Sequence, residues 1–410
     1  MIEGEAKKKA QLSDKDNTHI SISELLGKYI GRELEFQNVK ITANEIHLIF
    51  QPFTRLPPAQ VPKKPSVKEI SALPRLEFEP PVHKYPGKIV EVRIGASKSE
   101  GGTRGSTVKL GGQQVLHFCS FEGVLPNGPV ISLDLFDAPV PLPKPVKENL
   151  KEVLEDPAEW AKLYVEKWGA RMVSLHLVST DPFVKDRSPS EAAKTVEDVL
   201  QAVDVPILVG GSGNPEKDPA VFEKVCEVAE GERILINSAT LDNDYKRIGR
   251  AVKRHGHAVV AFSAMDVNNA KQLNKKLLDP EVGLSREDIV MDPNTGALGY
   301  GLEYGFTVFE RLRLAALNGD KDCNMPIMSG STNAWGARES YKKKPELGPV
   351  ELRGPLWETV TALTMLLAGA DLILLMHPLS YKTLNTIIDS MMSLKQTEPL
   401  PYKEWVSMKG

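Results

Sequence analysis

Polar residues and glycines are concentrated between Asp292 and Tyr304, where the sequence is DPNTGALGYGLEY. An apolar run at 289–291 precedes this segment and a helical pattern follows it, which is typical of a strand that ends in a glycine-rich loop. Glycines let the backbone approach a ligand closely, because no Cβ intervenes. The segment predicts a ligand-binding loop, and a tight turn whose glycines serve only backbone geometry is the alternative. The loop residues that we expect to contact a ligand are Asp292, Asn294, Thr295, Gly296, Gly299 and Tyr300.

Similar polar residues follow other apolar runs in the chain. Their side chains are amides, hydroxyls and carboxylates, with His176 as a single imidazole among them. No HExxH motif, GxSxG elbow or P-loop accompanies them. They therefore predict hydrogen bonds to a flat organic ligand of low charge, with no metal-binding and no catalytic residue. The candidates outside the glycine-rich loop are Asp134, His176, Asn214, Asn237, Asp266, Asn268 and Ser329.

Several of the carboxylates also have a structural interpretation. Asp266 precedes a helical pattern and is equally suited to cap that helix, as is Asp218. Asp134 and Asp292 belong to strand-like runs instead, so we assign them to ligand binding. For His176, at the end of such a run, a core residue and a ligand contact remain equal alternatives.

The elements that must position these residues alternate from Pro129 onward. Eight apolar strand-like runs and eight helical runs occupy roughly 260 residues, close to the usual size of a (β/α)8 barrel, whose ligands bind at the carboxyl ends of the strands. A doubly wound open sheet is the alternative, but Gly210-Gly211-Ser212-Gly213 lacks the GxGxxG register typical of that fold. Strands are expected at 130–135, 172–177, 206–210, 234–237, 258–263, 289–292, 325–329 and 371–376. Helices are expected at 157–168, 189–203, 218–229, 244–255, 268–278, 304–317, 355–368 and 379–392.

Other segments flank the barrel, which we expect to span residues 129–392. Residues 1–50 predict a small module with a disordered start, and residues 51–86 carry nine prolines, which predict an extended linker. The alternating run 88–94 and the glycine pairs after it predict a β-hairpin within 87–128. A tail, 393–410, follows. The fold class is α/β: a (β/α)8 TIM barrel with an N-terminal β-rich extension and a small N-terminal module.

The composition limits what else the chain can bind. It has 410 residues, 26% of them charged, and a formal net charge of -3. This balance provides no basic surface for nucleic acid or an anionic membrane, and no apolar run reaches the ~18 residues that span a bilayer. Three cysteines without a CxxC pair argue against an iron–sulfur cluster in this chain. The charged N-terminus lacks the apolar core of a signal peptide, which predicts a cytoplasmic protein.

Several long motifs, in the same order, resemble the small subunits of corrinoid iron–sulfur proteins. Besides the glycine-rich loop and the hairpin at 95–112, they are STD at 179–181, DRSP at 186–189, GNPEKD at 213–218, DVNNAKQLN at 266–274, ERLRLAAL at 310–317, RGPLWE at 353–358, AGAD at 368–371 and MHP at 376–378. These motifs cover about residues 87–392. The additional N-terminal residues resemble the archaeal form of the family, the delta subunits of acetyl-CoA decarbonylase/synthase complexes.

The resemblance implies a (β/α)8 barrel that forms a heterodimer with a larger gamma subunit, which carries a 4Fe–4S cluster and a cobamide-binding domain. The cobamide would lie between that domain and the rim of this barrel, where the candidate residues would contact corrin amides without binding cobalt. With the other subunits, the heterodimer would transfer a methyl group between a methyl-tetrahydropterin and the nickel cluster of the synthase, and this chain would be a non-catalytic subunit. Bacterial members lack a counterpart of residues 1–86, so the resemblance implies nothing about that segment.

Two other hypotheses remain open. One is a barrel methyltransferase that binds the methylpterin on its own, through Asp134, Asn237 and Asp292. Such a chain would bind methylpterin without the larger subunit. The other is a structural tether acting through residues 20–86, whose deletion would break assembly of the complex while leaving the heterodimer intact.

Overall fold

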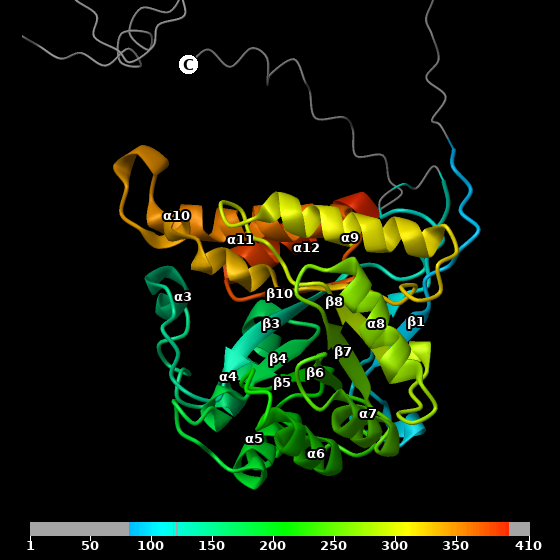
Figure 1. Ribbon diagram of the computed structural model, residues 1–410. Coiled ribbons are helices and arrows are strands. Elements are labelled where there is room, and N and C mark those ends of the chain that lie inside the picture. Colours follow the sequence, from blue (N-terminus) through cyan, green and yellow to red (C-terminus); the bar gives the residue numbers. More distant parts are fainter. Residues whose placement is uncertain (1–81, 118, 120–121, 393–410) are drawn as a thin grey trace, which may run out of the picture. The chain divides into compact units, whose positions relative to one another are not determined.

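Eight parallel strands form a closed barrel in the computed structural model of the chain (Figure 1). They are β3 (Val130–Phe136), β4 (Val173–His176), β5 (Ile207–Gly210), β6 (Leu235–Ala239), β7 (Ala258–Phe262), β8 (Ile289–Asp292), β9 (Met328–Ser329) and β10 (Leu372–Leu375). Strands adjacent in the sequence are adjacent in the barrel, and β10 pairs back with β3. A parallel bridge between Met291 and Ile327 joins β8 to the start of β9. The predicted (β/α)8 barrel is confirmed.

The described part of the chain comprises residues 82–117, 119 and 122–392. The chain divides into two compact units, Met1–Glu77 and Phe78–Gly410, and all described residues belong to the second. The predicted module at 1–50, most of the predicted linker at 51–86 and the tail at 393–410 lie outside the described residues. Within the described residues, no helix combines the length and the apolar character that crossing a membrane requires.

Helices connect successive strands on the outside of the barrel (Figure 1). They are α4 (Pro157–Lys162), α5 (Pro189–Ala202), α6 (Asp218–Val228), α7 (Tyr245–Arg254), α8 (Val267–Leu278), α9 (Leu302–Leu317), α11 (Val350–Leu367) and α12 (Pro378–Met392), with the short helices α3 (Lys144–Glu148) and α10 (Arg338–Tyr341). The cap of α5 illustrates how the sequence sets a boundary. Glu191 N donates to Ser188 Oγ at 3.3 Å, and Ser188 N donates to the Glu191 carboxylate at 2.8 Å, so Ser188 and Glu191 form a capping box.

Two predicted boundaries differ from the structure. The strand expected at 325–329 contains only Met328–Ser329, because Ile327 N donates to the Asp371 carboxylate at 2.8 Å. The helix expected from Pro355 begins at Val350, so Pro355 lies inside α11 and not in its first turn. Proline lacks an N–H group, so α11 loses one backbone hydrogen bond there.

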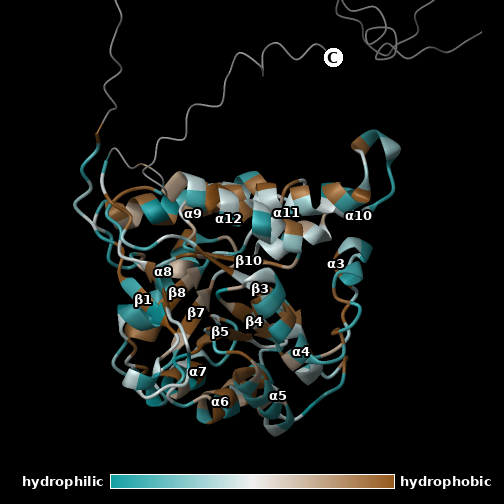
Figure 2. Cartoon of the chain, turned by 180° about the vertical axis from the view of Figure 1, so that it is seen from behind, coloured by the Kyte–Doolittle hydropathy of each residue, from teal (hydrophilic) through white to brown (hydrophobic). Residues whose placement is uncertain are grey.

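The side chains of each strand alternate between the barrel interior and the surrounding helices. Leu133 and Leu175 point outward and belong to the core shared with the helices. Figure 2, which views the chain from behind, shows apolar residues on the inner strands. The inward apolar cluster contains Val130, Met172, Leu208, Leu235, Val260, Val290, Met328, Leu372 and Leu374. Positions two or four residues further along a strand have the same orientation, and this alternation carries polar residues into the barrel at its carboxyl end.

An antiparallel hairpin closes the amino-terminal end of the barrel. Its strands β1 (Glu91–Ile94) and β2 (Val108–Gly111) pair with each other, in agreement with the predicted hairpin. Val92, Ile94, Val108 and Leu110 from these strands are part of the inward apolar cluster. The amino-terminal end of the barrel is therefore filled with apolar side chains, and polar side chains inside the barrel occur toward its carboxyl end.

A buried carboxylate, Asp371, fastens the segment after the hairpin to the barrel. Gln113 Nε2 donates to Asp371 Oδ1 at 2.8 Å, His117 Nε2 lies 3.3 Å from the same oxygen, and the guanidinium of Arg313 pairs with Oδ2. Burial by itself raises the pKa of Asp371, but Arg313 and His117 outweigh burial and hold this pKa at about 2. Asp371 is thus ionised across the physiological pH range.

Candidate functional site

Four candidate residues continue the inward positions of their strands to the carboxyl end of the barrel. Asp134 lies two positions beyond Ser132 on β3, and His176 lies two beyond Ser174 on β4. On β6 and β8, the inward apolar residues Leu235 and Val290 lie two positions before the other two candidates. The four residues are Asp134, His176, Asn237 and Asp292. Alternation along the strands therefore accounts for their common orientation.

Asp134 and His176 form the best-defined pair at this end. His176 Nε2 lies 3.0 Å from Asp134 Oδ1, and the imidazole stacks on Phe136 with ring centroids 5.3 Å apart. Gly210 on the next strand makes room for the ring, since a Cβ there would lie 2.6 Å from His176 Nδ1. The pair is thus positioned by an aromatic ring on one strand and by a missing side chain on another.

The residues around this pair support it from below. Ser132 Oγ and Ser174 Oγ are 2.7 Å apart one layer deeper in the barrel, and Tyr164 OH donates to the carbonyl of Asp134 at 2.8 Å. Asp134 Oδ1 and His176 Nε2 are themselves buried, and neither makes a well-directed hydrogen bond within the described residues. Both atoms therefore keep the capacity to bind a polar group of a ligand.

Asp292 ends β8 in a buried position. Asn294 N donates to its Oδ1 at 2.8 Å, which favours the ionised form. Burial outweighs this hydrogen bond and raises the pKa of Asp292 to about 7. Near neutral pH the carboxyl group exists in both protonation states, so it can donate or accept a hydrogen bond.

A chain of buried hydroxyl groups follows Asp292. Thr295 Oγ1 lies 2.8 Å from Ser329 Oγ, which lies 2.8 Å from Ser331 Oγ. Asn333 Nδ2 donates to the carbonyl of Thr295 at 3.1 Å. The loop after β8 is thereby fixed to the loop after β9, and the structure brings the predicted residues Thr295 and Ser329 together.

The glycine-rich loop has structural requirements of its own. A Cβ at Gly296 would lie 1.9 Å from the carbonyl oxygen of Gly301, so only glycine fits there. Gly299 has a φ of 72° and Asn294 one of 68°. Tyr300 is 68% exposed at the tip. The close backbone approach is therefore within the loop itself, while Tyr300 faces solvent.

Three other candidates lie outside the barrel interior. Asn214 Oδ1 accepts from Glu216 N at 3.0 Å and from Lys217 N at 3.1 Å. Asp266 caps α8 by accepting from Asn269 N at 2.8 Å, which confirms its structural interpretation. Asn268, the second residue of α8, is exposed. Asn214 and Asp266 thus stabilise the loops on which they lie.

The structure adds a pocket that the sequence did not single out. It has a volume of about 480 Å³ and lies between the loops that follow β5, β6 and β7. Ser263, which is only 4% exposed, lines this pocket, and its Oγ has no hydrogen-bond partner within the described residues. Asp218 also lines it, and this carboxylate accepts from Ser212 N at 3.0 Å and from Gly213 N at 2.9 Å. A polar group of a ligand would complete the hydrogen bonding of Ser263.

A second residue missed by sequence reasoning is Glu358, in the middle of α11. Its buried carboxylate accepts from Met376 N at 2.7 Å and from His377 N at 3.2 Å, just after β10. Burial outweighs these hydrogen bonds and raises the pKa of Glu358 to about 7. A glutamate in a helical pattern gives no signal of this kind, because its partners are distant in the sequence.

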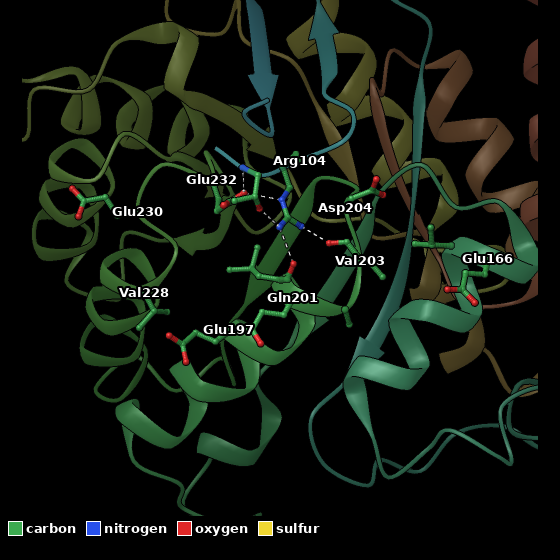
Figure 3. A pocket seen from close by; sticks show the side chains of 13 residues that line it. Arg104, Glu166, Glu197, Gln201, Val203, Asp204, Val228, Glu230 and Glu232 are labelled. Carbon is green, nitrogen blue, oxygen red and sulfur yellow. Dashed lines mark hydrogen bonds and ion pairs between the residues drawn. The ribbon is translucent and has the colours of Figure 1, made fainter. Parts of the chain in front are cut away.

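Another pocket, of about 600 Å³, lies at the opposite end of the barrel (Figure 3). At its wall the buried guanidinium of Arg104 donates to Glu232 at 2.7 Å and to the carbonyls of Val203 and Leu200 at 2.6 and 2.8 Å. Arg104 is therefore occupied in joining the hairpin to the barrel. Within the described residues, no group of three or more His, Cys, Asp or Glu side chains is arranged to hold a metal ion.

The sequence is similar to proteins of one family. Residues 91–344 match the family described as CO dehydrogenase/acetyl-CoA synthase delta subunit. The acetyl-CoA decarbonylase/synthase complex subunit delta of Methanocaldococcus jannaschii is 50% identical over 381 residues, which cover 90% of this chain and 91% of that protein. The protein of the same name from Methanothermobacter thermautotrophicus is 48% identical over 377 residues, covering 91% and 94%. Among solved structures, a dihydropteroate synthase from Coxiella burnetii in complex with pteroic acid aligns with 66% of this chain and 95% of its own, at 14% identity and a TM-score of 0.46.

Proposed function

The chain belongs to the family of CO dehydrogenase/acetyl-CoA synthase delta subunits, and we propose that within such a complex its barrel holds a cobamide against a second subunit. The observation that carries the proposal is a set of buried polar atoms, at the carboxyl end of the barrel, whose hydrogen bonding is incomplete within the described residues. Ser263 Oγ has no hydrogen-bond partner there, and Asp134 Oδ1 and His176 Nε2 have only their mutual contact at 3.0 Å. Buried polar atoms normally have partners, so these three fit a site that a polar ligand completes.

The chemistry of these residues fits the edge of a corrin. A corrin ring carries primary amides around its edge, and an amide offers both donors and an acceptor. Asp134 and Asp292 can accept from amide N–H groups, and the hydroxyl of Ser263 can donate to an amide oxygen. A bound cobamide supplies methyl-group transfer, whereas the residues of this chain bind and orient the cofactor and exclude water from it.

The proposed second subunit is the gamma subunit of the corrinoid iron–sulfur heterodimer, which would contribute both the iron–sulfur cluster and the cobamide-binding domain. Tyr300 and Tyr304 support the proposal that a second subunit covers this end of the barrel, because they are 68% and 66% exposed beside the candidate site. Exposed aromatic side chains of this kind are frequent in protein interfaces.

A specific observation also favours the alternative of a pterin-binding barrel methyltransferase. Asp134, Asn237 and Asp292 occupy inward positions at the ends of three strands, where their amide and carboxylate groups suit a pterin. This alternative predicts that the chain binds a methylpterin without the gamma subunit.

Replacing Ser263 tests the proposed function. Because Ser263 Oγ makes no hydrogen bond to any described residue, Ser263→Ala is expected to leave the free energy of unfolding unchanged. In the heterodimer it is expected to weaken cobamide binding by about three- to tenfold, which corresponds to one hydrogen bond. Ser285→Ala is the matched control, since Ser285 bonds to Asp288 in the turn that precedes β8, at the amino-terminal end of the barrel, and its replacement is expected to leave the cobamide dissociation constant unchanged. Equal cobamide binding by Ser263→Ala and wild type would argue against the proposed contact.

A further inference from the structure

The loop between β9 and α11 forms an arm that extends beyond the barrel. The arm comprises residues 338–349 and includes α10 and the 3-10 turn Pro345–Leu347. Figure 1 shows the arm in orange, with α10 as part of it, projecting away from the strands. Tyr341 is 42% exposed at its base, and Leu352, just after the arm on α11, is 60% exposed. Large apolar side chains are thus exposed on a projecting part of the chain.

A buried arginine holds the arm in one conformation. Arg353, which is 3% exposed, donates from Nη1 to the carbonyls of Lys344 at 3.2 Å and Gly348 at 3.1 Å, and from Nη2 to the carbonyl of Lys342. The planar guanidinium thereby joins three carbonyls on both sides of the turn. Because the arm is ordered before any partner binds, association would require little further loss of conformational entropy.

The charge of the arm differs from that of the whole chain. Lys342, Lys343 and Lys344 are consecutive and exposed, whereas the chain as a whole has a net charge of -3. Within the described residues, none of the three lysines forms a salt bridge. Arg338 adds a fourth basic group, and Glu339 and Glu346 are the two acidic residues of the arm. The arm therefore presents a local excess of positive charge next to apolar side chains.

We propose that the arm is a docking surface for an acidic protein surface with an apolar centre, on another subunit of the same complex. Protein interfaces commonly combine an apolar centre with a polar rim, and opposite charges on the two rims steer association. Tyr341, Leu347 and Leu352 would form the centre, and the three lysines would form the rim. Membership in a family of complex subunits supplies the class of partner, and the proposal does not depend on cobamide binding.

Charge reversal tests the arm in the complex assembled from the purified full-length subunits. The triple variant Lys342→Glu, Lys343→Glu and Lys344→Glu is expected to weaken association at least about tenfold at low salt and to abolish the weakening that salt causes in the wild type. Sedimentation velocity at low and high salt measures both quantities. In contrast, Leu352→Asn is expected to weaken association while keeping the salt dependence, because it changes only the apolar centre.

A matched control makes the same charge change at the opposite end of the barrel. Lys98, Lys167 and Lys321 are exposed and lie in segments that precede strands, so their replacement by Glu is expected to leave association unchanged. Wild-type affinity of the arm variant, or an equal loss in the control, would overturn the proposal. It would also be overturned if the chain alone formed a dimer that the arm variant lost, because the occupant would then be a second copy.

Discussion

His176 Nε2 contacts Asp134 Oδ1 diagonally across two strands, at a distance of 3.0 Å. In the register of β3 and β4, Asp134 is paired with Ser174, and His176 is paired with Phe136. The contact therefore depends on the orientation of the imidazole, which Phe136 stacks against and Gly210 accommodates. A sequence pattern places both residues at strand ends, but only the three-dimensional arrangement brings their polar atoms together.

Gly210→Ala is expected to disturb this arrangement from a distance. The added Cβ would lie 2.6 Å from His176 Nδ1, so the imidazole must move. If the pair binds cobamide, the variant heterodimer should bind it about tenfold more weakly, because one or two hydrogen bonds are lost. Equilibrium dialysis measures the effect. Gly128→Ala is the control, since its Cβ meets only ordinary contacts of 3.5 Å or more; an equal effect of the two variants would contradict the role of His176.

The pKa of Asp292 predicts a dependence of stability on pH. This carboxyl group has a pKa of about 7 in the folded chain, against 3.8 for the unperturbed group. Between these values the folded chain binds more protons than the unfolded chain, so the free energy of unfolding falls as the pH rises and the loss is complete above about pH 7. Asp292→Asn removes this loss. Between about pH 4 and pH 8, its free energy of unfolding is expected to rise relative to that of the wild type by up to about 4 kcal/mol. Urea denaturation at a series of pH values measures the difference, and parallel curves for the two proteins would contradict it.

Asp371 predicts the opposite dependence at acid pH. Its pKa of about 2 lies below the usual 3.8, so its contribution to stability is present above about pH 4 and is lost as the pH falls through 2. Asp371→Asn leaves the buried guanidinium of Arg313 without its carboxylate and is expected to cost about 3–5 kcal/mol. Thermal or urea denaturation at neutral pH measures this cost. Glu281→Gln, at an exposed pair with Lys246, should leave stability close to wild type. An equally small effect of Asp371→Asn would contradict the stabilising role of the ion pair between Asp371 and Arg313.

The hydrogen bonds of Arg353 predict that the arm is rigid. Arg353→Met keeps the apolar volume but removes the hydrogen bonds to three arm carbonyls. Each bond contributes about 0.5–1.5 kcal/mol, so we expect cleavage by trypsin after Lys342, Lys343 and Lys344 to become at least about tenfold faster. Limited proteolysis followed by mass spectrometry measures the rate. Arg250→Met, which removes a surface charge that pairs with Glu281, should leave cleavage of the arm unchanged; equal rates in both variants would contradict the role of Arg353.

Much of the fold could be predicted from the sequence because it depends on local patterns. Alternating apolar runs and helical runs located all eight barrel strands, and the end of each run located Asp134 and Asp292. The positions that were wrong depend on distant contacts. Strand β9 is short because the N–H group of Ile327 bonds to the Asp371 carboxylate, 44 residues away, although Ile327 still bridges to Met291. Pro355 is tolerated inside α11.

The candidate site was less predictable for the same reason. Ser263 was one of many polar residues at strand ends, and only its burial without a partner distinguishes it. Glu358 lies in a helix, and its carboxylate reaches backbone N–H groups 18 and 19 residues away. Such features depend on packing between elements, which periodicity and residue type do not report.

The measurement that tests the central claim most directly is a UV–visible titration of cobamide into the purified chain, alone and together with the gamma subunit. The proposed function predicts that the spectrum of bound cobamide develops only when both subunits are present, because the site is completed at their interface. Tight binding of cobamide by the chain alone would contradict that prediction. Tight binding of methylpterin by the chain alone, in a parallel titration, would instead support the methyltransferase alternative.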